Sequence, residues 1–280
     1  MMDSEKTEAA AWFSSLRDQI VAAFEGLEDQ AGGACPAGRF EVTPTTRPDG
    51  GGGLMSVMRG GRVFEKVGVN ISTVWGSLGA RAQAAMAARG VPGMAEDPRF
   101  WASGISLVAH KQNPHAPAVH MNTRMFWTPG AWWFGGGADL NPCIEYPEDT
   151  AHFHATLRLA CEAHGADRYP RFKAWADEYF FIPHRGRARG VGGIFYDDLN
   201  TGDWAADFAF TQDVGRAFLP LAERHHAQPF TDADRDTQLI HRGLYAEYNL
   251  VYDRGTKFGL ETGHNPDAVL MSLPPLAKWI

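Results

Sequence analysis

The sequence predicts an α+β fold: one domain over residues 1–280, with a large, mostly antiparallel sheet flanked by helices. Two observations predict it. Extended segments follow one another across short turns, which favours antiparallel pairing, and helical segments gather elsewhere in the chain instead of alternating strictly with strands. No linker-like or repeated segment divides the 280 residues, and this length suits one large domain.

The first part of the chain is predicted as a helix, a strand and a hairpin. Apolar residues at three- and four-residue steps predict a helix over residues 7–29, and alternation predicts a strand over residues 39–46. Gly60-Gly61 lies between two apolar segments and predicts a β-hairpin, whose second strand continues through residues 69–75. An alanine-rich helix is expected over residues 80–88, because Gly90 follows it.

The rest of the chain is predicted as strands and then helices, with strands returning near the end. Turn residues separate three extended segments at residues 104–110, 118–127 and 131–139. Helical segments are expected at residues 149–164, 170–181, 203–226 and 232–243. Further strands are expected at residues 191–196, 245–252 and 268–273.

Composition and charge exclude several partners and locations. The formal net charge is −7, and charges of both signs are mixed along the chain, so nucleic acid is not expected as a partner. No apolar stretch has the length of a membrane span, and the acidic amino terminus lacks the pattern of a secretory signal. The three cysteines form no CxxC pair, which predicts a cytoplasmic protein in a reducing compartment.

Three consecutive glycines followed by an acidic residue make Trp132 to Asp139 the most unusual segment. Because glycine lacks a Cβ, such a run lets the backbone approach another surface closely or adopt positive φ, which would place Asp139 at the mouth of a pocket. The alternative is a tight bend after a buried strand, with Asp139 capping a turn.

Histidines and arginines are frequent around this segment. His110 and His120 lie in neighbouring predicted strands and can face each other across a hairpin, whereas His152 and His154 point about 200° apart on a helix. Imidazoles from separate elements can bind a metal, although this spacing matches no compact zinc motif. Arginines suit carboxylate binding, and solvated surface charge is the alternative for most of them, including Arg185, Arg187 and Arg189.

Common catalytic and cofactor motifs are missing from the sequence. It contains no GxSxG elbow, no HExxH motif, no P-loop, and no pattern typical of a flavin, nicotinamide or iron–sulfur site. A middle region rich in glycine, histidine, arginine and aromatic residues suits a pocket for a large, flat, anionic ligand.

Long segments of the chain resemble the oxygen-dependent coproporphyrinogen III oxidases. These segments are GVNISTVWG (68–76), GISLVAHKQNPHAPAVHMNTRMF (104–126), WWFGGGADLNP (132–142), YPRFKAWADEYFFIPHRGRARGVGGIFYDDLN (169–200), YNLVYDRGTKFGLETG (248–263) and LMSLPP (270–275). They run from the first third of the chain to its end, so the resemblance covers nearly the whole sequence.

The resemblance implies an enzyme of haem biosynthesis that converts two propionates of coproporphyrinogen III into vinyl groups by oxidative decarboxylation, giving protoporphyrinogen IX. Molecular oxygen is the implied electron acceptor. No organic cofactor is implied, because the reduced tetrapyrrole itself supplies the electrons. A divalent metal cation, with Mn²⁺ as the usual suggestion, and a homodimer are further implications of the resemblance.

Individual residues match positions with a role in that family. The implied catalytic residues are His120 as proton donor, Asp139 at the pyrrole N–H groups, and Arg124. The implied substrate-binding residues are Ser106, Asn122, Thr123, Arg124, Gly263, His264 and Asn265, and the implied metal ligands are His110, His120, His154 and His184. His120 cannot donate a proton and ligate a metal through the same nitrogen, so these two roles are alternatives.

The carboxyl-terminal region differs from the family at one position and carries the expected dimer contact. The family often has a basic residue after the glycine of the TG pair, where this chain has His264 and Asn265, so a propionate contact there is expected to be weaker or mediated by water. The segment from Tyr245 to Gly259, continued to Trp279, is expected to form the dimer, with its predicted strand as the buried edge.

Two other functions remain open at this point. A non-haem metal oxygenase requires two histidines and one carboxylate around a metal with an open position. A non-catalytic tetrapyrrole-binding protein would hold the substrate without consuming oxygen.

Overall fold

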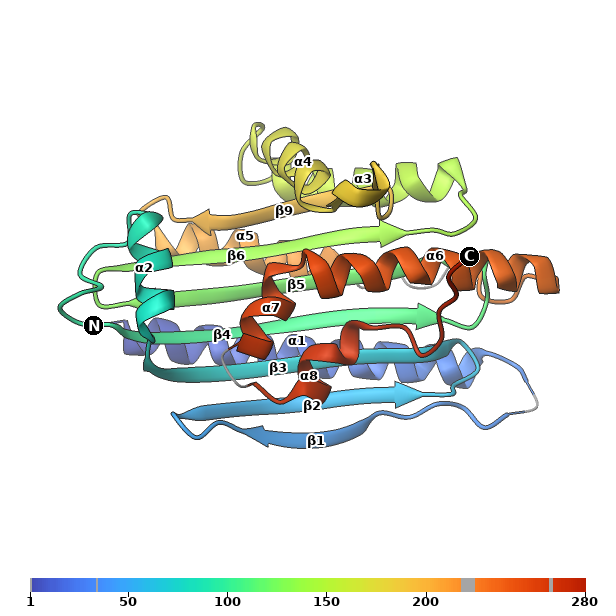
Figure 1. The fold of residues 1–280 in the computed structure, drawn as a ribbon, viewed down its shortest axis with the longest axis horizontal. Coiled ribbons are helices and arrows are strands. Elements are labelled where there is room, and N and C mark those ends of the chain that lie inside the picture. Colours follow the sequence, from blue (N-terminus) through green and yellow to red (C-terminus); the bar gives the residue numbers. More distant parts are fainter. Residues whose placement is uncertain (1, 34, 218–224, 262–263) are drawn as a thin grey trace.

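The computed structural model describes residues 2–33, 35–217, 225–261 and 264–280. Its main sheet is antiparallel throughout and has the strand order β1-β2-β3-β4-β5-β6-β9 (Figure 1). The strands are β1 (Glu41–Thr46), β2 (Gly51–Arg59), β3 (Phe64–Ser77), β4 (Arg99–Lys111), β5 (Ala118–Thr128), β6 (Ala131–Asn141) and β9 (Gly193–Leu199). A two-stranded sheet pairs β7 (Phe181–Ile182) with β8 (Arg187–Ala188). The predicted α+β class with a large antiparallel sheet is confirmed.

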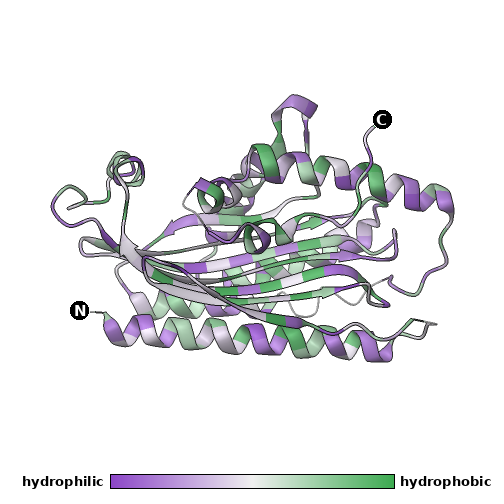
Figure 2. Cartoon of the chain, turned by 60° about the horizontal axis from the view of Figure 1, so that its bottom comes forward, coloured by the Kyte–Doolittle hydropathy of each residue, from purple (hydrophilic) through white to green (hydrophobic). Residues whose placement is uncertain are grey.

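Helices cover both faces of the main sheet. On the back face in Figure 1 lie α1 (Asp3–Gln30) and α5 (Trp204–Ala217), and on the front face lie α6 (Asp232–Val251), α7 (Arg254–Glu261) and α8 (Pro266–Val269). Figure 2 shows α1 running along one side of the sheet. Beside β9 lie α3 (Pro147–Glu162) and α4 (Arg168–Tyr179), and α2 (Ala80–Ala88) stands at one end of the sheet. Among the described residues, no helix combines the length and apolar character needed to cross a bilayer.

The alternation of side chains along β5 separates the core from the front face. Val119, Met121 and Met125 are buried with the back-face helices in the largest apolar cluster. Their neighbours His120 and Arg124 point to the opposite face, because successive side chains of a strand alternate. The front face of β5 therefore carries polar groups on a strand whose back face is held in the core.

The predicted strand over residues 245–252 is wrong, because these residues complete α6. The helix begins with a capping box in which Thr231 and Asp234 bond each other's backbone N–H groups. Its buried residues recur every three or four positions, as Gln238, Arg242, Tyr245, and then Tyr248 or Asn249. Aromatic and β-branched residues in this stretch favour strands locally, but the helical spacing of the buried face prevails.

The predicted strand over residues 268–273 is also wrong. Asn265 caps α8 by accepting a hydrogen bond from the Asp267 N–H, and a 3₁₀ turn, Leu270–Ser272, follows. The predicted helix over residues 203–226 corresponds to α5, which ends at Ala217, and part of its predicted end lies outside the described residues. The hairpin at Gly60-Gly61 is confirmed by the β2–β3 pairing.

A buried carboxylate fastens the end of α1 to this hairpin. Glu28 is fully buried and accepts hydrogen bonds from the backbone N–H groups of Gly38, Arg62, Val63 and Phe64, at 2.6–2.9 Å. A Cβ on Gly61 would lie 2.4 Å from the carboxylate, so only glycine fits there. Burial alone would raise the pKa of Glu28, but the four N–H donors hold that pKa below its usual range.

Replacing Glu28 with glutamine is expected to destabilise the fold by roughly 3 kcal/mol, because an amide offers one acceptor oxygen and leaves buried donors unpaired. The depressed pKa means that the wild-type contribution is present above the unfolded-state pKa of about 4.3 and is lost as pH falls below it. Urea unfolding of wild type and Glu28→Gln at pH 7 and pH 4 measures both effects. The exposed Glu8→Gln variant on the same helix is the control, and equal stability of the two variants would contradict this role of Glu28.

Candidate active site

The front face of β5 presents three polar side chains in a row: His120, Asn122 and Arg124. The strand register places Asp139 opposite His120, Gly137 opposite Asn122 and Gly135 opposite Arg124 on β6. On the other side, Ser106 of β4 pairs with Asn122. Alternation on β5 and its pairing with β6 therefore bring His120, Asn122, Arg124 and Asp139 onto one face of the sheet.

Asp139 is buried and forms an ion pair with Arg189, which lies in the segment between β8 and β9. The guanidinium donates from Nε to Asp139 Oδ2 at 2.8 Å and from Nη2 to Oδ1 at 2.6 Å. Asn141 also donates to Oδ2, at 2.9 Å. Burial would raise the pKa of Asp139, but the Arg189 charge and these hydrogen bonds hold that pKa far below its usual range. The carboxylate is therefore fixed in its charged form.

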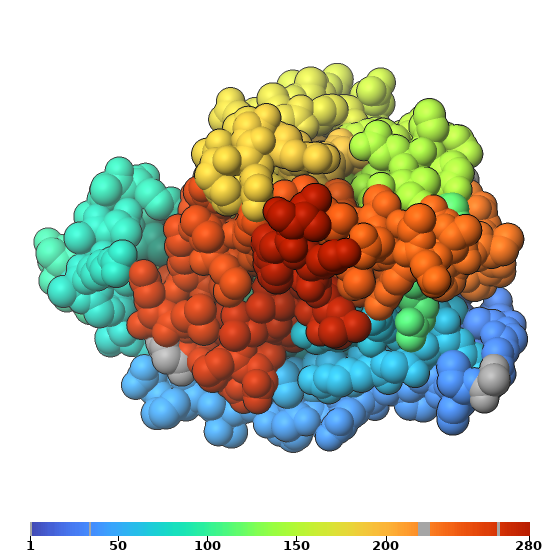
Figure 3. All heavy atoms as spheres, turned by 45° about the vertical axis from the view of Figure 1, so that its right-hand side comes forward, coloured from blue at the N-terminus to red at the C-terminus, as the bar shows by residue number. Residues whose placement is uncertain are grey.

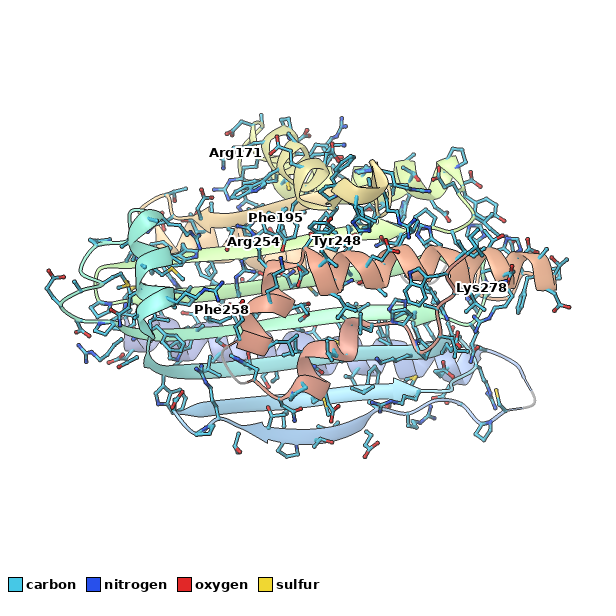
Figure 4. All side chains as sticks on the ribbon, in the orientation of Figure 1. Arg171, Phe195, Tyr248, Arg254, Phe258 and Lys278 are labelled. Atoms are coloured by element: carbon cyan, nitrogen blue, oxygen red, sulfur yellow. The ribbon has the colours of Figure 1, made fainter. Side chains whose placement is uncertain are left out.

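Three aromatic rings enclose the Arg189 guanidinium. Phe180, Tyr245 and Tyr248 place their ring centres 4.5–4.7 Å from its central carbon. Tyr245 and Tyr248 belong to α6, and Figure 4 shows Tyr248 on this helix in front of the sheet. The part of α6 that was predicted as a strand thus closes the buried ion pair against the sheet.

Hydrogen bonds along β5 define the tautomer of His120. Its Nδ1–H donates to Asp139 Oδ1 at 2.7 Å. Arg124 Nη1 donates to Asn122 Oδ1 at 3.1 Å, and the Asn122 amide then donates to His120 Nε2 at 3.0 Å. Because Arg124 fixes the orientation of the Asn122 amide, His120 presents Nε2 as an acceptor and is neutral in this arrangement.

Arg124 ends this chain of hydrogen bonds in a second ion pair. Its Nη2 donates to Asp197 of β9, and Asp197 also contacts Arg89, which follows α2, at 3.6 Å. Burial would lower the pKa of Arg124, but Asp197 raises it above its ordinary value. The Arg124 side chain keeps 35% of its surface exposed, so this cation can still reach an anionic ligand.

Gly135 of β6 makes room for the ion pair of Arg124 and Asp197. None of Gly135, Gly136 and Gly137 has a positive φ, and all lie within the strand. A Cβ on Gly135 would lie 3.0 Å from both Arg124 Nη2 and Asp197 Oδ1. On β4, a Cβ on Gly104 would lie 2.8 Å from the Arg124 Cβ. The predicted close approach is confirmed, and the alternative of a tight bend is wrong. The expected position of Asp139 at the mouth of a pocket is also wrong, because its side chain is fully buried.

Part of this face is open. Ser72 on β3 is exposed although its strand lies inside the sheet, and it pairs with the half-buried Gly104. Gly104 pairs in turn with Arg124, and Ser106 with Asn122, all of which keep some exposed surface. We call Ser72, Gly104, Ser106, Asn122 and Arg124 the open strip. Its small residues leave space for a flat ligand directly on the strands.

The remaining residues expected to bind substrate lie in different places. Thr123 points to the back face, where it is fully buried and bonds Gly135 and Tyr196, so its side chain does not line the open strip. Asn265 caps α8, and the Asn70 amide beside Ser106 donates to the Ala268 carbonyl of that helix. The segment holding Asn265 and His264 therefore lies at the β3 side of the strip, whereas Gly263 lies outside the described residues.

The four histidines expected as metal ligands bond to four different sets of partners. His110 donates to the Ser272 carbonyl, and His154 donates to Val191 and accepts from Tyr169. His184 is exposed and bonds Glu247 and Tyr252. Among the described residues, no group of three or more His, Cys, Asp or Glu side chains is arranged to hold a metal. The four histidines thus do not fit a shared metal centre in this arrangement.

Sequence reasoning missed Arg189 and Asp197. For Arg189 solvated surface charge was the alternative to carboxylate binding, and Asp197 was not named among the expected site residues. The available signal was Asp139 itself, because a carboxylate next to a buried glycine strand requires a buried cation. The sequence did not show which of the alternating arginines at 185, 187 and 189 meets it.

Comparisons with known proteins show the family to which the chain belongs. The family model for coproporphyrinogen III oxidase matches residues 8–280. Proteins named oxygen-dependent coproporphyrinogen-III oxidase are 48% identical in Rickettsia bellii, with all of both chains covered, and 47% identical in Rickettsia africae, with 99% of this chain and all of the relative covered. A relative of the same name in Rickettsia felis is 48% identical over the full length of both chains. The chain therefore belongs to the coproporphyrinogen III oxidase family.

Proposed function

We propose that this protein is an oxygen-dependent coproporphyrinogen III oxidase, which converts two propionates of coproporphyrinogen III into vinyl groups and releases protoporphyrinogen IX for haem biosynthesis. The observation that carries the proposal is the continuous row from Arg189 through Asp139, His120 and Asn122 to Arg124, beside an open strip of small residues. Full-length similarity to relatives of that name supports it.

In this proposal His120 is the group that moves a proton. Its Nε2 accepts from Asn122 in the free protein, and a pyrrole N–H that displaces the amide can donate to the same nitrogen. Loss of that proton makes the pyrrole ring richer in electrons for transfer to oxygen. The imidazolium so formed is a proton donor for reduced oxygen, which agrees with the role implied by the resemblance.

Asp139 acts through His120 in this proposal, as a positioning residue. Its carboxylate has no exposed surface and is fully engaged by Arg189, His120 and Asn141. It keeps the proton of His120 on Nδ1 and stabilises the imidazolium. The earlier assignment of Asp139 to the pyrrole N–H groups is therefore replaced by His120 Nε2.

The chemistry balances without an organic cofactor. Each propionate carboxylate gives up carbon dioxide, two electrons and one proton. Oxygen takes the two electrons, this proton and one further proton from solvent to form hydrogen peroxide, and the pyrrole nitrogen regains the proton that it lent to His120. Although it is paired with Asp197, the Arg124 side chain remains partly exposed. Its guanidinium binds a substrate carboxylate in this proposal. We derive no step through a metal, because the histidines expected as ligands lie apart in the structure.

A homodimer and a cytoplasmic location complete the proposal. Large apolar side chains of the carboxyl-terminal region are exposed: Leu250, Val251, Phe258, Leu260, Leu276 and Trp279. Figure 3 shows that this region, in orange and red, covers much of one face of the molecule. Several exposed apolar residues in one region suit an association surface, although the segment is helical and cannot offer the strand edge that was expected. The three free cysteines fit a reducing compartment.

The proposed reaction predicts a fixed stoichiometry. The purified protein is expected to consume one molecule of oxygen and release one of carbon dioxide for each propionate lost, to stop without oxygen, and to remain active after strong chelation. An oxygen electrode with chromatography of the oxidised porphyrins measures this. Decarboxylation without oxygen would contradict the oxidase. Substrate binding without oxygen uptake would favour a carrier. Activity that is lost on chelation and restored by Mn²⁺ would favour a metal enzyme.

The positioning role of Asp139 predicts non-additive mutations. Asp139→Asn and His120→Ala are each expected to lower kcat by about 10²–10⁴-fold, and the double variant is expected to lose little more than His120→Ala alone, because Asp139 acts through His120. Single-turnover kinetics measure the effect, and thermal unfolding checks the fold. The exposed Asp198→Asn on β9 is the control, and multiplying losses in the double variant would contradict the relay.

The apolar surface predicts a dimer that one charge can weaken. Wild type is expected to sediment as a dimer at micromolar concentration, and Leu250→Glu is expected to shift it toward monomer, because the introduced carboxylate would be buried without a partner. Leu159→Glu on α3 replaces an even more exposed leucine and serves as the control. A monomeric wild type, or equal behaviour of both variants, would contradict this interface.

A further inference from the structure

Arg47 is a cation of the front face that the proposed reaction has not used. It follows β1, where its N–H donates to the Gly51 carbonyl at 3.0 Å. Its guanidinium lies 5.5 Å from the centre of the Phe100 ring on β4. The side chain thus crosses the sheet toward the strand that carries Gly104 and Ser106.

The guanidinium of Arg47 is poorly paired. Its Nη1 is buried and has no hydrogen-bond partner among the described residues. Its ionic contact is to Asp49 at 3.5 Å, and the Asp49 side chain is 69% exposed. Arg189 and Arg124, in contrast, make close ion pairs with buried carboxylates. A mostly buried guanidinium with an unused donor is suited to an external carboxylate.

Arg47 lies outside the open strip, on its Phe100 side, whereas Arg124 lies within the strip. Gly104 pairs with Arg124, and Phe100 lies four residues earlier on β4, about 13 Å along the strand. The Arg124 side chain extends away from Phe100, past Gly135, to Asp197. The two guanidinium groups are therefore roughly 15 Å apart at the strand spacing of a sheet, a span that suits a macrocycle of four pyrrole rings with carboxyethyl arms on opposite edges.

The carboxyl-terminal segment lacks a permanent cation beside the strip. His264 and Asn265 stand there. Burial lowers the pKa of His264, and the charge of Arg47 lowers it further. An ion pair also links α2 and α7, since Arg81 of α2 and Glu261 of α7 are 3.3 Å apart.

We propose that Arg47 binds a carboxylate of the porphyrinogen that is not lost in the reaction, on the Phe100 side of the open strip. This inference rests on the proposed function, because it takes coproporphyrinogen III as the ligand. The reacting propionate lies near His120, whereas the Phe100 end of β4 is remote from His120 along the strands. Arg47 thus supplies at this end the charge that His264 and Asn265 do not carry.

Steady-state kinetics of two Arg47 variants test the inference. Arg47→Gln is expected to raise KM for coproporphyrinogen III by about 10- to 100-fold, the usual range for a charge-assisted hydrogen bond, while kcat stays within about twofold, because a remote contact binds substrate and transition state equally. Arg47→Lys is expected to recover part of the loss. The exposed Arg59→Gln on β2 is the control, and thermal unfolding checks each fold.

A substrate analogue makes the test specific to one carboxylate. The analogue is coproporphyrinogen III with a primary amide in place of one non-reacting propionate. For wild type, the KM for this analogue is expected to be higher than the KM for coproporphyrinogen III. For Arg47→Gln, the two KM values are expected to be equal, because the contact is already lost. The inference would be overturned if every such amide raised KM equally in both proteins. It would also be overturned if Arg47→Gln had the KM of wild type for coproporphyrinogen III.

The failure of this inference is distinguishable from failure of the proposed function. If wild type consumes no oxygen with coproporphyrinogen III, the proposed function fails and the inference fails with it. If wild type is active and Arg47→Gln only lowers the melting temperature while KM is unchanged, Arg47 is structural and the inference alone is overturned.

Discussion

The buried ion pair of Asp139 and Arg189 is the interaction on which the rest of the site depends. A carboxylate in the interior stays charged only beside a well-matched cation, and both of its oxygens are paired with the Arg189 guanidinium. The fixed charge of Asp139 holds the His120 proton on Nδ1. Nε2 of His120 is then left as the acceptor on the front face. The orientation of one imidazole thus follows from a buried ion pair.

Two distant parts of the chain must meet for that ion pair to form. Asp139 is placed by the β5–β6 register, whereas Arg189 reaches it from the segment before β9 and is enclosed by Tyr245 and Tyr248 of α6. The aromatic rings exclude water from the guanidinium while their π faces stabilise its charge. The site is therefore complete only when α6 is packed on the sheet.

Much of this site was accessible from the sequence, because the two-residue period of a strand decides which side chains share a face. That period places His120, Asn122 and Arg124 together, and it equally sends Thr123 to the back. The resemblance alone had given all four residues, including Thr123, a role at the site. Arg189 was not accessible, since loop residues have no period that predicts their direction. The strand expected at residues 245–252 failed because local β propensity competed with a helical spacing set by tertiary packing.

The charge distribution explains how an acidic chain can bind a tetra-anionic substrate. The formal net charge is −7, yet Arg47, Arg89 and Arg124 all approach the open strip, where Asp197 is the carboxylate that contacts two of them. Arg189 offsets the charge of Asp139 at close range, so Asp139 repels an anionic ligand only weakly. Local potential depends on which charges are paired and buried, and only weakly on their sum over the chain. The glycines of β4 and β6 contribute to the same end, since they let guanidinium groups and a flat ligand lie against the strands.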